Sequence, residues 1–123
     1  IFFWGCQKNE PTLVPPEANF GASATTIFKG QAVNFTDLST MNPSTWAWTF
    51  TGGDPSFSTQ KNPSNIAYAA PGVYDVSLTV SSTDGSNTKT MTGYITVKDA
   101  HVQTLLDNDV PINNILNNFL FTF

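Results

Sequence analysis

The chain has 123 residues and a formal net charge of −4, and its five basic residues are scattered lysines. Charged residues make up 11 % of the sequence, against roughly 25 % in an average soluble domain. Thr, Ser and Asn take their place, as is common in secreted all-β domains. Without a basic cluster, the chain is not expected to bind nucleic acid. One Cys and one His exclude an internal disulfide, a zinc site and a Ser-His-Asp triad within these residues.

The first residues are apolar up to Gly5-Cys6, after which polar residues begin at once. This pattern resembles the lipobox of bacterial lipoproteins, in which the cysteine becomes the first mature residue and carries acyl chains. Residues 1–6 are interpreted as the end of a signal peptide that starts before the given sequence, and Cys6 as the lipidation site. The alternative is a free cysteine in an apolar strand.

Residues 7–18 contain Pro11, Pro15 and Pro16 and show little periodicity. Because proline fixes φ and removes a backbone donor, this segment is expected to be an extended tether. The resemblance at Cys6 then implies that the membrane is a partner, through the lipid anchor. The domain would stand on the outer surface of a bacterial cell envelope.

Between residues 19 and 98, short alternating segments are separated by turn-forming residues. The expected strands cover residues 19–23, 31–37, 45–51, 65–69, 74–81 and 87–98. Residues 28–30 should turn, and residues 52–64, rich in Gly, Pro, Ser and Asn, should form a loop. Asp84-Gly85 should close a hairpin between the last two strands.

Trp46, Trp48 and Phe50 alternate with small or hydroxylated residues, so all three rings leave one face of a strand. Each ring can bury roughly 150–250 Å², which requires a second sheet to cover them. The strand ends at the turn-forming pair Gly52-Gly53. This stripe predicts a β-sandwich with Trp48 near its centre; stacking of the rings on sugars is the alternative.

The clearest alternation in the chain should direct one row of side chains into the core: Tyr74, Val76, Leu78 and Val80. Tyr74 follows Pro71-Gly72, which fits a tyrosine corner with its hydroxyl on the adjoining turn. In the preceding strand, Ile66 and Tyr68 share a face.

The last strand should place Met91, Gly93, Ile95 and Val97 on one face. Tyr94 then falls on the opposite, threonine-rich face. Tyr94 is therefore the candidate for an exposed aromatic contact.

These features predict an all-β, immunoglobulin-like antiparallel β-sandwich of about seven strands. The chain resembles the PKD (polycystic kidney disease) domain, over about residues 20–97. The residues that carry the resemblance are Trp46, Trp48, Phe50, Gly52, Gly53, Asn62-Pro63, Tyr68, Pro71-Gly72, Tyr74, Val76, Leu78, Val80 and Gly85. The family motif Trp-x-Phe-Gly-Asp-Gly is altered here to Thr51-Gly52-Gly53-Asp54 after Phe50, a variant similar to PKD modules of exported Bacteroidetes-type lipoproteins.

The resemblance implies a non-catalytic, monomeric module that acts as a spacer or adhesion domain for contacts with proteins or carbohydrates. The alternative is an accessory module of an exported glycoside hydrolase or protease whose catalytic domain lies outside this chain.

The acids of the domain are Asp37, Asp54, Asp75 and Asp84, which are expected to form turns or face solvent. No catalytic residue, cofactor or metal site is expected. A calcium site at Asp37 and Asp54 is the alternative, because both follow strands, although no ligand spacing supports it.

Residues 99–123 are expected to form a tail with a short helix or the start of a following domain. From Ile112 onward, apolar residues recur at helical spacing opposite asparagines. A membrane-surface helix is the alternative, which the lack of basic residues disfavours.

Overall fold

The computed structural model describes residues 11–99, and these residues form strands and no helix. The strands are β1 (Phe20–Ala22), β2 (Thr26–Phe28), β3 (Ala32–Val33), β4 (Phe35–Asp37), β5 (Thr45–Phe50), β6 (Gly53–Asp54), β7 (Phe57–Ser58), β8 (Ile66–Tyr68), β9 (Gly72–Ser82) and β10 (Gly85–Lys98). Accordingly, this part of the chain has no helix that could span a membrane. The helix predicted for the tail lies outside the described residues.

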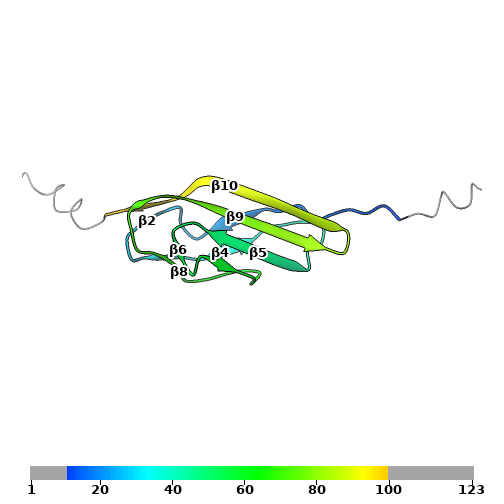
Figure 1. Cartoon of the computed structure of the whole chain (residues 1–123), viewed down its shortest axis with the longest axis horizontal. Coiled ribbons are helices and arrows are strands. Elements are labelled where there is room, and N and C mark those ends of the chain that lie inside the picture. Colours follow the sequence, from blue (N-terminus) through cyan, green and yellow to red (C-terminus); the bar gives the residue numbers. More distant parts are fainter. Residues whose placement is uncertain (1–10, 100–123) are drawn as a thin grey trace, which may run out of the picture.

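The strands form three sheets: a five-stranded sheet in the order β2-β10-β9-β5-β7, a three-stranded sheet β3-β8-β6, and the pair β1-β4. The hairpin of β9 and β10 runs along most of the elongated domain (Figure 1). All pairs are antiparallel except β2 with β10, which are parallel. The predicted all-β, immunoglobulin-like sandwich is confirmed.

The core is built from inward-facing side chains of all three sheets. Its buried members are Ala18, Phe20, Ile27, Val33, Phe35, Trp48, Phe50, Ile66, Tyr68, Val76, Leu78, Val80, Ile95 and Val97. Trp48 is 1 % exposed, and its ring lies 5.2 Å from that of Phe20 and 5.7 Å from those of Phe35 and Phe50. Trp48 is thus in the core, as its position in the stripe predicts.

Tyr74 forms the predicted tyrosine corner. Its hydroxyl donates a hydrogen bond to the carbonyl of Ala70 over 2.9 Å, and its ring lies 5.4 Å from that of Tyr68. Gly52 has φ +79° and lies directly against the Tyr74 ring, where any Cβ atom would collide with it. Glycine is therefore required at this turn for both its backbone conformation and its size.

Several short strands occur where turns or loops were predicted. β2 includes Phe28, which was assigned to a turn, and β6 and β7 lie inside the predicted loop 52–64. Strands of two or three residues are too short to show an alternation, so their backbone pairing leaves no clear signal in the sequence.

The predicted tether of residues 7–18 is corrected in its last part, which packs on the domain. Pro16 and Ala18 are buried. The backbone amide of Ala18 donates to the side chain of Asn87 over 2.7 Å, and that of Val14 donates to Asp84 over 3.2 Å. The proline-containing segment is therefore bound to the β9–β10 hairpin from Val14 onward.

The prediction that Tyr94 is an exposed aromatic is wrong. The pairing of β10 with β9 shifts register between Met91 and Ile95, and Gly93 adopts φ +64° at this bulge. Tyr94 is half-buried against the core, with its ring edge-on to Phe20 at 5.6 Å. The bulge adds residues to β10, and these interrupt the regular alternation of faces.

Trp48→Ala should lower the free energy of unfolding by about 3–5 kcal/mol, because it removes the ring at the centre of the core. Urea melts of the two proteins measure the change. Phe57→Ala is the control: Phe57 is 68 % exposed, and its loss should change stability by less than about 0.5 kcal/mol. An unchanged midpoint for Trp48→Ala would contradict the core role.

The neighbouring rings of Tyr68 and Tyr74 give a second test, because only one of their hydroxyls has a hydrogen-bond partner among the described residues. Tyr74→Phe loses the bond to Ala70 and should cost about 0.5–1.5 kcal/mol. The Tyr68 hydroxyl is buried and has no hydrogen-bond partner among the described residues, so Tyr68→Phe should be neutral or stabilising. Equilibrium unfolding of both variants decides it. A larger loss for Tyr68→Phe would contradict this assignment.

Burial, together with the nearby Tyr74, raises the pKa of Tyr68 to about 12 from its ordinary value of 10.0. Below pH 10 both folded and unfolded states are protonated; above it the unfolded state loses the proton first. Stability should therefore fall between pH 10 and 12, by roughly 1.4 kcal/mol per pH unit for this group. Urea melts across this range should show a smaller loss for Tyr68→Phe. Equal losses would contradict the shift.

Candidate functional site

The four carboxylates singled out in the sequence are spread over the domain, and three of them bind backbone amides. Asp37 accepts from the amide of Ser39 at 3.0 Å, Asp75 from that of Gly93 at 2.7 Å, and Asp84 from that of Val14 at 3.2 Å. Asp54 is exposed in β6. These contacts assign Asp37, Asp75 and Asp84 to holding a turn, the β10 bulge and the N-terminal segment.

The calcium alternative for Asp37 and Asp54 gains no support from the geometry. Within residues 11–99, no three His, Cys, Asp or Glu side chains come close enough together to hold a metal ion. The predicted lipidation site, Cys6, lies outside the described residues.

The aromatic stripe divides into a buried part and a partly exposed part. Trp48 and Phe50 are fully buried, so neither can stack on a sugar. Trp46, at the other end of β5, is only partly covered and packs on the edge of the core. The question of a platform is therefore confined to Trp46.

Trp46 lines a hollow of about 460 Å³ between the loop 37–43 and Lys61. A second hollow of about 270 Å³ adjoins it, with Met41 and Asn42 common to both and Val14 and Asp84 on its far wall. Volumes of this order are at the lower end of those that hold small ligands. This end of the domain is the candidate site.

The loop that forms the wall is held in an uncommon conformation. Met41 and Asn42 have φ values of +64° and +54°, a left-handed conformation that is costly for a residue such as methionine. Met41 is 56 % exposed, although an apolar side chain of this size gains by burial. The loop thus holds the Met41 side chain beside Trp46 in the lining of the hollow, on a strained backbone that the rest of the fold keeps in place.

Lys61 and Trp46 provide the polar and aromatic groups of the hollow. The Lys61 ammonium lies 5.7 Å from the centroid of the Trp46 ring, within cation–π distance. The indole Nε1 of Trp46 is buried and has no hydrogen-bond partner among the described residues. Leaving such a donor unpaired costs about 1–3 kcal/mol, and its burial keeps it out of reach of a ligand in the hollow.

Sequence reasoning found Trp46 but missed Lys61 and Met41. Lys61 belongs to the predicted loop 52–64, whose path over β5 depends on a bond from the Trp48 indole N–H to the carbonyl of Gln60, 2.9 Å away. No local pattern signals this contact. The run Met41-Asn42-Pro43 indicated a loop but not its left-handed backbone.

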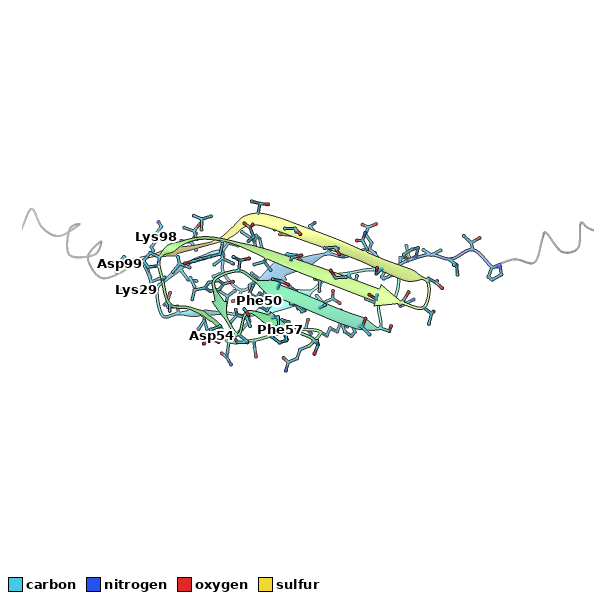
Figure 2. The ribbon with its side chains drawn as sticks, in the orientation of Figure 1. Lys29, Phe50, Asp54, Phe57, Lys98 and Asp99 are labelled. Carbon is cyan, nitrogen blue, oxygen red and sulfur yellow. The ribbon has the colours of Figure 1, made fainter. Side chains whose placement is uncertain are left out.

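The outer face of the five-stranded sheet is a second, different surface. Neighbouring residues of β5, β9 and β10 form three rows across this face. The rows are Thr49, Ser77 and Thr90; Ala47, Thr79 and Thr88; and Thr45, Ser81 and Ser86. The hydroxyls of Thr79 and Thr88 lie 2.7 Å apart. Phe57 lies beside Thr49 at the edge of this face, on the flank of the domain in Figure 2. The nine positions of these rows carry no charge.

Comparison with solved structures shows similar folds in several proteins. The PKD1 domain of Vibrio anguillarum Epp is 30 % identical, with a TM-score of 0.57 over 70 % of this chain and 99 % of that one. A structure described as carbohydrate-binding modules of the β-sandwich superfamily is 28 % identical, with a TM-score of 0.60 over 73 % of this chain and 37 % of that one.

A Methanosarcina mazei protein solved by NMR is 27 % identical, with a TM-score of 0.55 over 77 % of this chain and 62 % of that one. Comparison with curated proteins gives no match. The model of the PKD domain family matches residues 13–97. Because this match covers well over half of the chain, the protein belongs to the PKD domain family.

Proposed function

We propose that this PKD domain is a non-catalytic module on the surface of a bacterial lipoprotein, where it acts as a spacer and adhesion domain for contacts with proteins or carbohydrates. The observation that carries the spacer role is the position of the chain ends. The blue start of the described chain and Asp99 lie at opposite ends of the long axis (Figures 1 and 2). A domain with this arrangement adds its length to whatever it connects.

Both ends of the described chain are tied to the sandwich. At one end, Val14 and Ala18 are hydrogen-bonded to the β9–β10 hairpin. At the other, Lys29 and Asp99 form an ion pair of 3.2 Å (Figure 2), although exposed pairs contribute at most about 1 kcal/mol. These contacts support the transmission of a fixed orientation through the domain rather than a loose connection.

The adhesion role is supported by the two surfaces described above. The hydroxyl-bearing sheet face and the hollow beside Trp46 are uncharged overall and can hydrogen-bond to sugars or to peptide groups. A similar structure is described as carbohydrate-binding modules. The alternative is that the domain accompanies the catalytic domain of an exported glycoside hydrolase or protease, and the reading frame beyond Phe123 would distinguish the two.

The adhesion role is tested by applying the 123-residue chain to immobilised polysaccharides and extracellular proteins. Binding that competes with the free polysaccharide or protein is expected. Failure to bind any of them would leave the spacer role alone.

The location on the cell surface depends on Cys6. The complete gene, expressed in a bacterial host with a fatty-acid analogue, should yield a labelled protein in the membrane fraction, and Cys6→Ser should abolish both label and membrane attachment. Multiple acyl chains give firm attachment because each buried methylene contributes about 0.8 kcal/mol. Absence of label, or label unchanged in Cys6→Ser, would contradict the lipid anchor.

Surface exposure is tested separately, by adding a protease to intact cells that make the wild-type protein. The protease should cleave the domain, and protection of the domain would contradict surface exposure.

A further inference from the structure

We infer that the hollow beside Trp46 binds one pyranose residue of an uncharged saccharide; this rests on the proposed adhesion function and gives it a site. The hollow lies at the end of the domain where residues 14–18 dock, at the start of β5. It is separate from the hydroxyl-bearing sheet face and from Phe57. Three features of its walls lead to this ligand.

The first feature is an apolar floor of the right kind. The Trp46 ring and the exposed Met41 side chain both line the hollow. A pyranose ring presents apolar C–H groups on one face, and these can pack on the Met41 side chain and on the part of Trp46 that lines the hollow, beside the Lys61 ammonium 5.7 Å from the ring centroid. A thioether is polarisable and adapts its shape to such a partner.

The second feature is a set of polar groups that can both donate and accept. Asp37 uses one carboxylate oxygen to hold the Ser39 amide, and a carboxylate has capacity for several more hydrogen bonds. Lys61 supplies an ammonium with three donors, and Asn42 supplies an amide. Adjacent sugar hydroxyls donate and accept at once, which matches a hollow that offers both a carboxylate and an ammonium.

The third feature is the charge balance of the hollow. Among its lining residues, Asp37 and Lys61 carry single opposite charges, and they are not within ion-pair distance of each other. A ligand with a net charge would be attracted by one and repelled by the other. An uncharged ligand with several hydroxyls can bind both.

The test uses the 123-residue chain labelled with nitrogen-15, whose three tryptophans give separate indole N–H signals, assigned by single Trp→Phe variants. Methyl glycosides of glucose, galactose, mannose and N-acetylglucosamine are the probes. For a single sugar residue, a Kd on the order of 1 mM is expected. At least one glycoside should shift the Trp46 indole signal saturably, together with the amides of residues 37–43, while the buried Trp48 signal stays in place.

Three variants then separate the contributing groups. Asp37→Asn keeps the acceptor for the Ser39 amide but loses the charge, and Lys61→Met keeps the apolar stem but loses the donors; each should weaken binding about tenfold. Trp46→Phe should abolish the shifts at residues 37–43. Lys29→Ala, at the other end of the domain, and Phe57→Ala, an exposed aromatic elsewhere, are the matched controls and should bind as the wild type does.

Each contrary result overturns the inference in a recognisable way. Sugars that shift signals of β5, β9 and β10 around Phe57 would place glycan binding on the sheet face and leave the adhesion proposal standing. Shifts that survive Asp37→Asn and Lys61→Met unchanged would mean non-specific contact. Shifts produced by peptides but by none of the glycosides would assign the hollow to protein binding. If neither glycosides nor immobilised polysaccharides bind, the carbohydrate part of the proposed function fails as well.

Discussion

Burial of the Trp48 indole organises both the core and the loop above it. The ring contacts Phe20, Phe35 and Phe50 from three strands. Its N–H would be a costly unpaired donor in this position, and it is satisfied by the carbonyl of Gln60. The same bond therefore anchors the loop after β7 over the sandwich, in a chain with too few cysteines for an internal disulfide. Since Lys61 is the next residue, the core interaction also positions the cation that lies above Trp46.

A second constraint acts at the opposite end of β5. Tyr74 hydrogen-bonds to the turn before its own strand, and its ring leaves no room for a side chain at Gly52. The altered motif after Phe50 thus keeps a glycine where the tyrosine ring lies, although the family's acidic residue is displaced. β5 is fixed at one end by this contact, while its other end opens into the hollow. The end of β5 near Gly52 is therefore held rigidly, while its start, near Trp46, is the part that borders the proposed binding hollow.

The sequence was informative where alternation extends over five or more residues. Trp48, Phe50, Val76, Leu78 and Val80 were all assigned correctly to the core, because a half-buried strand exposes every second residue. It was misleading where a single backbone irregularity decides the outcome. Tyr94 is half-buried against the core because of a bulge at Gly93, whose amide donates a hydrogen bond to the Asp75 side chain on the neighbouring strand β9. Likewise, the proximity of Lys61 to Trp46 depends on long-range contacts that no local pattern encodes. The short strands β2, β6 and β7 are defined by their partners alone.

The docking of the N-terminal segment on the last hairpin has a consequence for how the domain is made. Val14 and Asp84 are separated by 70 positions, and Ala18 and Asn87 by 69. The first part of the domain to be synthesised therefore waits for the last part before Pro16 and Ala18 can be buried. Contacts of this sequence separation slow folding, and synthesis proceeds at about 5–20 residues per second. The sandwich should accordingly fold as a single unit only after the β9–β10 hairpin has been synthesised, and shortened chains that end before the hairpin would retain no stable part of it.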